Sequence, residues 1–439
     1  MKLFNLAAAL TTLAAVFGYI NYRWIRLPAT IGVLALALAG SLTTIVFDAL
    51  VPSAGMREAA ATLLQGVDFH AALMNGMLCF LLFAGALHVD FADMRANGRF
   101  VAVLSTVGVL MSTILVGLGL YLVLGAIHRP LPLLVCLVFG ALISPTDPVA
   151  VLGLLKDLHA PRDMTALMAG ESLFNDGMGV VVFVACAGLA GVGTGDGAPM
   201  VPDIAHLVLF FGREIGGGLL LGAFTGYLAY RALKSVDYHP LELLVTVALV
   251  MFVYGLSLAC GASGPIAVVV AGMIIGNPGR KWAMSENTRR YMDAFWSMVD
   301  EILNAILFLL LGLQSLAISW QSSTLLAGLV LVPVVLLARL VSVAAPMALL
   351  PRSSPRHGLV TILTWGGLRG GIAVALVLSL SEFPGRPLLL GITFVVVVFS
   401  ILIQGTTTPW LLVRYGWASS ARIPRNLKLG GARPDSMPN

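Results

Sequence analysis

Thirteen apolar runs, most of them near twenty residues long, follow one another along this chain with short polar connections between them. An α-helix needs about twenty apolar residues to cross the hydrocarbon core of a bilayer. Only 11% of the residues are charged and the mean hydropathy is +0.95, so no stretch remains for a separate globular domain. We therefore predict an all-α polytopic membrane protein. The expected spans are 3–20, 30–51, 70–89, 100–125, 131–154, 170–190, 205–231, 239–259, 262–276, 294–316, 324–349, 358–381 and 387–412.

Basic residues gather on the connections of one side of these spans. If connections alternate sides, Arg23, Arg26 and the basic tail 415–439 fall on the rich side. The poor side receives only Lys2, Arg57, Arg129 and Arg386. Because basic loops stay cytoplasmic, we predict a cell-membrane protein (inner or plasma membrane) with its N-terminus outside and a short cytoplasmic tail. The net charge of +5 then reflects topology, and we expect a lipid bilayer rather than nucleic acid as the partner.

The first span has a second interpretation. Lys2 precedes an apolar run rich in Ala and Leu, which is also typical of a cleaved signal peptide. Arg23 and Arg26 follow the run directly, and this favours a retained anchor with its N-terminus outside. We expect the span to be retained, since its removal would unbalance the repeat described next.

The spans form two sets related by spacing. Spans two to six correspond to spans nine to thirteen at a separation of roughly 220–230 residues, and the first and eighth spans are somewhat farther apart. The odd-numbered seventh span between the two sets inverts the second one, so the spacing predicts two inverted six-helix repeats. Equivalent spans, the fifth and the twelfth, are interrupted. The interruptions are Ser144-Pro145-Thr146-Asp147-Pro148 and Gly366-Gly367-Leu368-Arg369-Gly370-Gly371.

Both interruptions are expected to unwind a helix near the middle of the membrane. Pro145 and Pro148 lack N–H groups, so carbonyls near Ala141 and Ser144 should lose their helical partners and become available to a cation or water. The glycines of the other break, which lower the cost of irregular backbone, are Gly366, Gly367, Gly370 and Gly371. A proline kink or glycine-mediated packing would explain either break alone. Matched positions favour crossed discontinuous helices of a secondary transporter, each carrying a charge.

A polar string, Glu171-Ser172-Leu173-Phe174-Asn175-Asp176, interrupts the sixth span. At helical spacing Ser172 and Asp176 share one ridge, with Glu171 and Asn175 on the next. A carboxylate at bilayer depth costs roughly 2.5–3.5 kcal/mol, so two of them need a reason. An internal salt bridge is one explanation. An ion or proton pathway is the one we favour, because a hydroxyl, an amide and carboxylates converge on one face.

Two further arginines fall within spans. Arg213 has Glu214 beside it near an interface and is interpreted as a snorkelling pair. Arg339 lies deeper, between apolar residues on both sides, and needs a buried acidic partner.

Four strings together carry a family resemblance. They are SPTDPVAV, GESLFNDG, the segment 300–308 leading to Leu311-Gly312-Leu313-Gln314, and GGLRGGIAVAL. In order and spacing they resemble the Na+/H+ exchanger family of monovalent cation:proton antiporters. The resemblance implies a homodimer of thirteen-helix protomers, with a transmembrane antiporter domain over 1–414. It also implies a mobile core near 100–190 and 324–412, with the remaining helices forming the dimerisation part.

The resemblance also implies roles at the ion site. Asp176 resembles the essential carboxylate that binds Na+ and H+ in alternation, and Asn175 resembles the residue that marks electroneutral exchangers. Thr146 and Asp147 resemble ion-site residues of the fifth span, with Ser172 completing a cage of oxygens. A Na+ ion is thus expected at Asp176, Ser172 and Thr146.

The resemblance also implies roles for residues around the site. Glu171 and Arg339 resemble a buried structural ion pair, and Arg369 resembles a residue that offsets helix dipoles at the crossing. The third span departs from the pattern, because Ala84-Gly85 stands where many bacterial members have an acidic residue. From the short basic tail after Tyr415 we expect no large cytoplasmic regulatory domain.

The expected function is secondary transport rather than enzymatic catalysis, with no cofactor beyond the transported ions. One carboxylate that carries either a proton or Na+ (or Li+) couples their exchange one for one without net charge movement. A K+/H+ antiporter shares every motif and is the near alternative. A cation channel or an intramembrane protease is the distant one. Ser263 imitates a protease serine, but the only histidine after it, His357, falls in an expected connection.

Overall fold

Every regular element in the described part of the chain is helical. The computed structural model describes residues 2–51, 69–147, 151, 155, 161–193, 204–318, 320–349 and 358–417. Within these residues nine helices are long and apolar enough to cross a membrane, or ten when α18 (Leu359–Gly366) and α19 (Gly371–Ser379) count as one bent span. The predicted all-helical membrane class is confirmed. The number of thirteen spans stays a prediction.

Most helices begin and end within a few residues of the predicted spans, whereas α10 and α16 each begin eight residues earlier than predicted. Besides α18 and α19, the α-helices of the described residues are α1 (Lys2–Ile20), α2 (Ala29–Leu50), α4 (Phe69–Ala71), α5 (Leu78–Leu87), α6 (Phe91–Val103), α7 (Val109–Ala126), α8 (Leu133–Ile143), α10 (Arg162–Ala190), α11 (Ile204–Phe211), α12 (Gly217–Lys234), α13 (His239–Cys260), α14 (Gly264–Ile274), α15 (Arg280–Trp282), α16 (Glu286–Gln314), α17 (Ser322–Leu349), α20 (Arg386–Phe399) and α21 (Gly405–Arg414). Short π-helical turns, which often mark functional sites, continue several of them. They are η1 (Asn21–Ile25), η3 (Ala72–Met77), η4 (Leu104–Gly108), η5 (Gly212–Gly216), η6 (Ile275–Gly279) and η7 (Ser400–Gln404).

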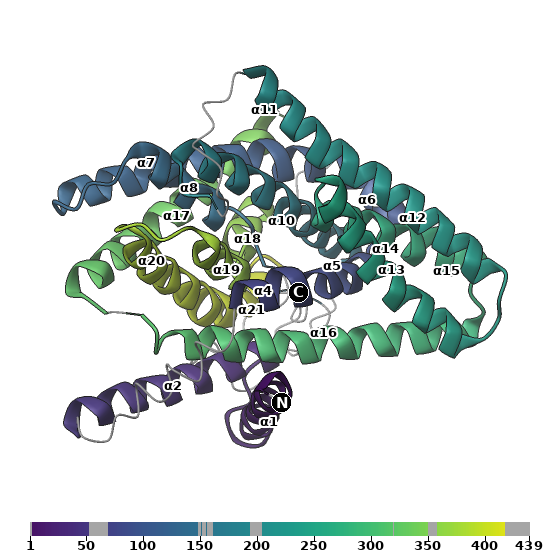
Figure 1. Ribbon diagram of the computed structural model, residues 1–439, viewed down its shortest axis with the longest axis horizontal. Helices are drawn as coiled ribbons and strands as arrows, with labels where there is room; N and C mark the ends of the chain where they lie inside the picture. Colours follow the sequence, from purple (N-terminus) through teal and green to yellow (C-terminus); the bar gives the residue numbers. More distant parts are fainter. Residues whose placement is uncertain are drawn as a thin grey trace, which may run out of the picture.

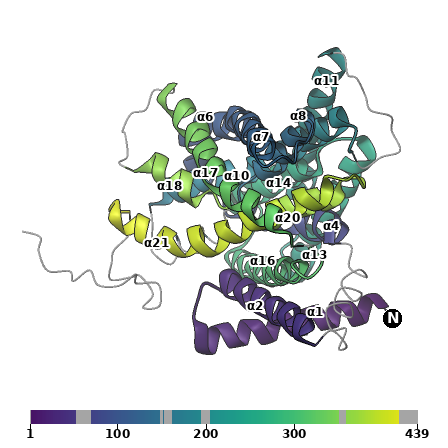
Figure 2. The ribbon, with the colours of Figure 1, turned by 90° about the vertical axis from the view of Figure 1, so that its left-hand side faces the viewer.

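The long helix α16 separates the N-terminal pair from the rest of the molecule. Figure 1 shows α16 running along one edge of the main body, with α1 and α2 packed on its far side, and Figure 2 shows the same order from the side. The helices that carry the predicted site, α8, α10 and the broken pair α18–α19, lie near the centre of the view in Figure 1. The polar residues of the site are therefore surrounded by helices.

Arg213 contacts the end of α13. Interpreted from the sequence as a snorkelling pair with the neighbouring Glu214, it donates two hydrogen bonds to the carbonyl of Cys260, at 3.0 and 2.7 Å from Nε and Nη2. Gly261 follows in the left-handed conformation, with φ of 62°. A cation at a helix C-terminus is favoured by the helix dipole. Arg213 therefore caps the last turn of α13.

Glycines allow the site helices to approach closely. A Cβ on Gly117 of α7 would lie 3.0 Å from the Cys136 carbonyl of α8, and one on Gly140 would overlap the Thr113 carbonyl. Gly179 of α10 abuts the ring of Pro145 in the same way. Small residues let backbones meet across membrane helices, so the backbone of the first break is held against α10.

Candidate ion-binding site

Two interrupted helices meet at the centre of the site. α8 ends at Ile143, and residues 144–147 continue without helical structure. α18 and α19 are bent by 49° at residues 367–370. The Asp147 amide donates to the Leu368 carbonyl at 2.8 Å. The two breaks are therefore joined backbone to backbone, and Pro148, predicted to contribute to the first one, lies outside the described residues.

Arg369 joins the same two breaks through its side chain. Its Nη1 donates to the carbonyls of Ser144 at 2.6 Å and Pro145 at 2.9 Å. We expected the carbonyls near Ala141 and Ser144 to be available to a cation or to water, and in the structure each has a protein donor. Arg369 donates to the Ser144 carbonyl, and the Ala141 carbonyl accepts a hydrogen bond from the Ser144 amide at 3.3 Å. Carbonyls freed at bilayer depth need donors, and a guanidinium also suits the negative end of α8.

The unbroken helix α10 braces the first break. Ser172 donates a short hydrogen bond to the Thr146 carbonyl, and the Asn175 Oδ1 accepts from the Thr146 amide at 3.2 Å. Asn175 Nδ2 also donates to Thr146 Oγ1 at 2.6 Å and to Glu171 Oε1 at 2.8 Å. The predicted shared face of the helix is thus bonded directly to the unwound backbone. Thr146 has its amide, its carbonyl and its hydroxyl all engaged.

Asp176 is the one carboxylate of this face with an unpartnered buried oxygen. Its side chain lies on α10 one turn beyond Ser172, and the residue is only 6% exposed. Its Oδ1 has no hydrogen-bond partner. A buried carboxylate oxygen without a partner is costly unless a proton or a cation neutralises it. The Ser172 hydroxyl donates its hydrogen bond to the Thr146 carbonyl, so the lone pairs of the Ser172 oxygen remain available to a cation.

Glu171 pairs with Arg339 of α17. Two hydrogen bonds of 2.9 Å join the carboxylate to Nη1 and Nη2, and both side chains are nearly fully buried. Arg339 Nη2 also donates to the Leu363 carbonyl of α18 at 3.3 Å. A Cβ at Gly367 would lie 2.7 Å from Arg339 Nε, so a glycine is needed there. The pair is bidentate and ties α10 to α17 and α18.

Asp147 lies against the second break. Gly370 abuts its carboxylate so closely that no side chain fits at residue 370. The Asp147 side chain is half-buried, whereas Asp176 is buried. The structure thus places both acidic residues of the predicted site beside the crossing, with Arg369 between the broken segments.

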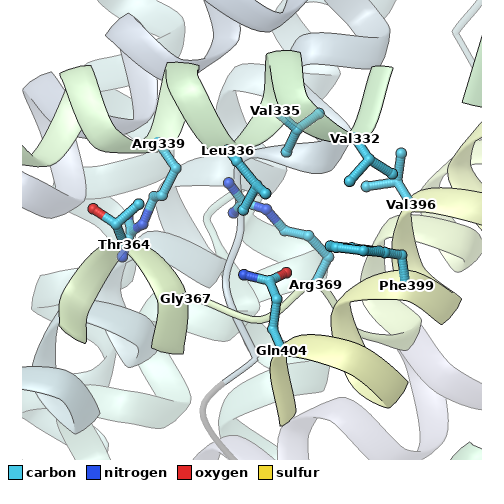
Figure 3. Close-up of a pocket in the computed structure, with 10 residues that line it drawn as sticks. All are labelled: Val332, Val335, Leu336, Arg339, Thr364, Gly367, Arg369, Val396, Phe399 and Gln404. Atoms are coloured by element: carbon cyan, nitrogen blue, oxygen red, sulfur yellow. The ribbon is translucent and has the colours of Figure 1, made fainter. Parts of the chain in front are cut away.

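A small pocket adjoins the second break. Figure 3 shows its walls: α17 on one side, the loop with Gly367 and Arg369, and Gln404 with Phe399 on the other. The remaining lining residues are Val332, Val335, Leu336, Arg339, Thr364 and Val396. Nε of Arg339 and Nη2 of Arg369 are buried without partners. The second break therefore has polar surroundings of its own.

Sequence analysis missed two residues that bond to the second break. The Arg369 amide donates to Ser400 Oγ, and Gln404 Nε2 donates to the Trp365 carbonyl, both at 2.9 Å. The sequence feature that could have identified them is their position as lone polar residues in the apolar segment Ser400-Ile401-Leu402-Ile403-Gln404. That spacing also fits helix-internal hydrogen bonds, so it did not single them out.

The crossed breaks beside a buried carboxylate define a secondary ion transporter. The sequence pattern described as "Sodium/hydrogen exchanger, transmembrane" matches residues 11–414. The chain belongs to this family, so the resemblance is confirmed. Membership also confirms the prediction of a multi-pass membrane transporter rather than an enzyme.

Two relatives are similar to this chain over most of their length. The Na+/H+ antiporter NhaP of Pseudomonas aeruginosa is 42% identical over 409 residues, covering 91% of this chain and 94% of that protein. The Na+/H+ antiporter NhaH of Halobacillus dabanensis is 34% identical over 375 residues, covering 82% and 87%. The fold matches the structure of the sodium proton antiporter MjNhaP1 from Methanocaldococcus jannaschii at pH 8, with a TM-score of 0.72 at 19% identity over 94% of this chain and 99% of that one.

Proposed function

We propose that this protein exchanges Na+ for H+ across a membrane, with both ions binding in turn at Asp176. The observation that carries the proposal is the buried, unpartnered Oδ1 of Asp176 beside two crossed helix breaks. The relatives named above are Na+/H+ antiporters, and this favours sodium over the K+/H+ alternative. Li+, which takes the same oxygen ligands, is a secondary substrate.

The proposed Na+ site uses oxygen atoms from the first break and from α10. Asp176 supplies the charged ligand, and the hydroxyls of Ser172 and Thr146 supply neutral ones. Hard monovalent cations exchange their water shell for such oxygens. Asn175 orients Thr146 without carrying charge, and Asp147 adds a second negative charge nearby.

The charges at the crossing suggest a one-for-one exchange. Glu171 and Arg339 cancel within their ion pair. Arg369 offsets one of the two remaining carboxylates, Asp147 and Asp176. One negative charge is left, and a single Na+ or a single H+ neutralises it. Because an uncompensated buried charge is costly to move through the membrane, the core should cross only when loaded.

Alternating access completes the proposal. The core, residues 100–190 and 324–412, would shift against the dimerisation part and present the site to each face in turn. We propose a homodimer with the N-terminus outside and the C-terminus in the cytoplasm, in keeping with the basic residues of the expected cytoplasmic connections. Glu171–Arg339 and Arg369 would then hold the moving core together and keep their charges through the cycle.

Reconstituted vesicles with an internal pH dye test the proposal. A pH gradient is imposed, and Na+, Li+ or K+ is added in turn to vesicles with the parent protein or Asp176→Asn. We expect Na+ to dissipate the gradient in the parent and to have no effect in the variant. Asp237→Asn, the same change at an exposed carboxylate, is the control and should behave like the parent.

Two results would contradict the proposal. Full exchange by Asp176→Asn would remove this residue from the site. A response to K+ alone would replace the sodium assignment by the potassium alternative.

A further inference from the structure

We infer that Ser400 and Gln404 are positioning residues for the ion site, which they serve by holding the second break and Arg369 in place. This inference rests on the proposed function, because it assigns the two residues to the same site. Both lie in the π-helical turn η7 and are almost fully buried, at 1% and 3% exposure.

The two side chains bond to backbone groups on either side of the break. Gln404 Nε2 donates to the carbonyl of Trp365, near the end of α18, at 2.9 Å. Ser400 Oγ accepts from the amide of Arg369, just before α19, at 2.9 Å. The Trp365 indole also donates to Thr407 Oγ1 at 2.8 Å. One stretch of helix thus supplies partners that the interrupted helix cannot supply for itself.

The first break is also held by a serine and a carboxamide side chain. There Ser172 and Asn175 of α10 bond to the carbonyl and the amide of Thr146. Ser400 follows Ser172, and Gln404 follows Asn175, at the roughly 220–230 residues that separate the predicted repeats. In both halves a serine and a carboxamide, about one turn apart, brace the interruption of the preceding span. The residue types and positions match, but the roles are exchanged: Ser172 donates to a carbonyl, whereas Ser400 accepts from an amide.

The contacts of Ser400 lead directly to the first break. Ser400 holds the backbone of Arg369, and the Arg369 side chain holds the carbonyls of Ser144 and Pro145. The next residue, Thr146, is the one braced by α10 and proposed to bind Na+. A shift of residue 369 would therefore move the backbone that presents the Thr146 ligand.

A small pocket lies beside the break and next to Arg369. Arg369 and Gln404 both line it, and Figure 3 shows them on the same wall as Phe399. Nη2 of Arg369 has no partner there. Ser400 and Gln404 hold the loop between α18 and α19 from the η7 side, whereas the Asp147–Leu368 bond and the Arg369 side chain hold it against the first break.

The test compares Na+ dependence in three serine variants. We expect Ser400→Ala to raise the Na+ concentration for half-maximal exchange in vesicles roughly five- to tenfold, as the loss of one buried hydrogen bond predicts. Ser400→Thr keeps the acceptor oxygen and should restore the parent value. Ser257→Ala is the matched control, because that buried hydroxyl bonds only to Val253 of its own helix. Gln404→Met should act like Ser400→Ala.

A second measurement does not depend on transport. Amide hydrogen exchange of the segment 365–371 in the purified protein should be faster in Ser400→Ala than in the parent and unchanged in Ser257→Ala. A parent protein without Na+/H+ exchange would remove the proposed function and leave this comparison intact. Unchanged Na+ dependence and unchanged amide exchange in Ser400→Ala would overturn the inference. So would failure of Ser400→Ala to fold, since Ser400 would then be a purely structural residue.

Discussion

Glu171 and Arg339 are joined by two hydrogen bonds of 2.9 Å at a depth where both side chains are almost completely buried. Asn175 donates a third hydrogen bond to Glu171 at 2.8 Å, and it also bonds to Thr146. The ion pair and the unwound backbone of the site are therefore connected by a single amide. Changes to the pair should first affect stability, and changes to Asn175 should affect both.

Arg339→Ala should destabilise the folded protein by about 3–5 kcal/mol, because it leaves Glu171 buried and unpaired. The paired change Glu171→Leu with Arg339→Met should recover most of the loss, since it removes both charges. Unfolding in detergent measures both variants. Arg280→Ala, which breaks an ion pair that is about 40% exposed, should cost at most about 1 kcal/mol. Equal losses in the two alanine variants would contradict a buried pair.

Gly179→Ala should destabilise the protein by about 1–3 kcal/mol, because the added methyl group would overlap the Pro145 ring. Gly188→Ala on the same helix has nothing within 4 Å of the new carbon and should be neutral or stabilising by up to about 1 kcal/mol. The unfolding temperatures of the two variants give the comparison. A harmless Gly179→Ala would mean that α10 and the first break are not in close contact.

Asn175→Asp should lower stability by about 1–3 kcal/mol, because a carboxylate cannot donate to Glu171 or to Thr146 Oγ1 as the amide does. Asn287→Asp is the control: this side chain is exposed in the first turn of α16, where a negative charge suits the helix dipole. Circular dichroism on heating can follow both variants. If Asn175→Asp is as stable as the parent, the amide donors are not needed.

The concentration of Na+ that gives half-maximal exchange should rise as the pH falls. A proton and Na+ compete for the one carboxylate of Asp176, so each unit of pH should raise the required Na+ up to about tenfold where the proton dominates. Initial rates in vesicles at several pH values measure this dependence. A half-maximal concentration that stays constant with pH would place the two ions at separate sites.

Membrane voltage should leave the exchange rate unchanged within about twofold, because one cation replaces another on one carboxylate. Vesicles clamped at opposite potentials with a potassium ionophore provide the measurement, with Na+ as the substrate. A steep dependence on voltage would show that more charge crosses in one direction than in the other.

Several site residues could be predicted because local spacing determines them. Ser172 and Asp176, four residues apart, share a face on any α-helix, and α10 is continuous through both. The breaks at Pro145 and at residues 366–371 follow from missing N–H groups and clustered glycines, which act within one turn. Arg339 lies between apolar residues, which predicts a buried acidic partner. The local sequence does not identify which residue that partner is.

Other contacts depend on helices that are far apart in the chain, and no local pattern specifies them. The Ser144 carbonyl was expected to face a cation, but Arg369, more than two hundred residues later, occupies it. Ser400 and Gln404 looked like ordinary polar residues in an apolar helix until α18 and α19 were placed beside them. Periodicity along one helix reports which side chains share a face, not which backbone group will be opposite.

The sequence by itself determined the membrane class, the positions of both breaks, the polar face of α10 and the family, since each depends on composition, spacing or residue type along the chain. Only the tertiary structure decided how the free backbone groups of the breaks are satisfied, and which oxygen is left over. Buried donors and acceptors must find partners across the packed helices, and Asp176 Oδ1 is an acceptor for which that packing provides none.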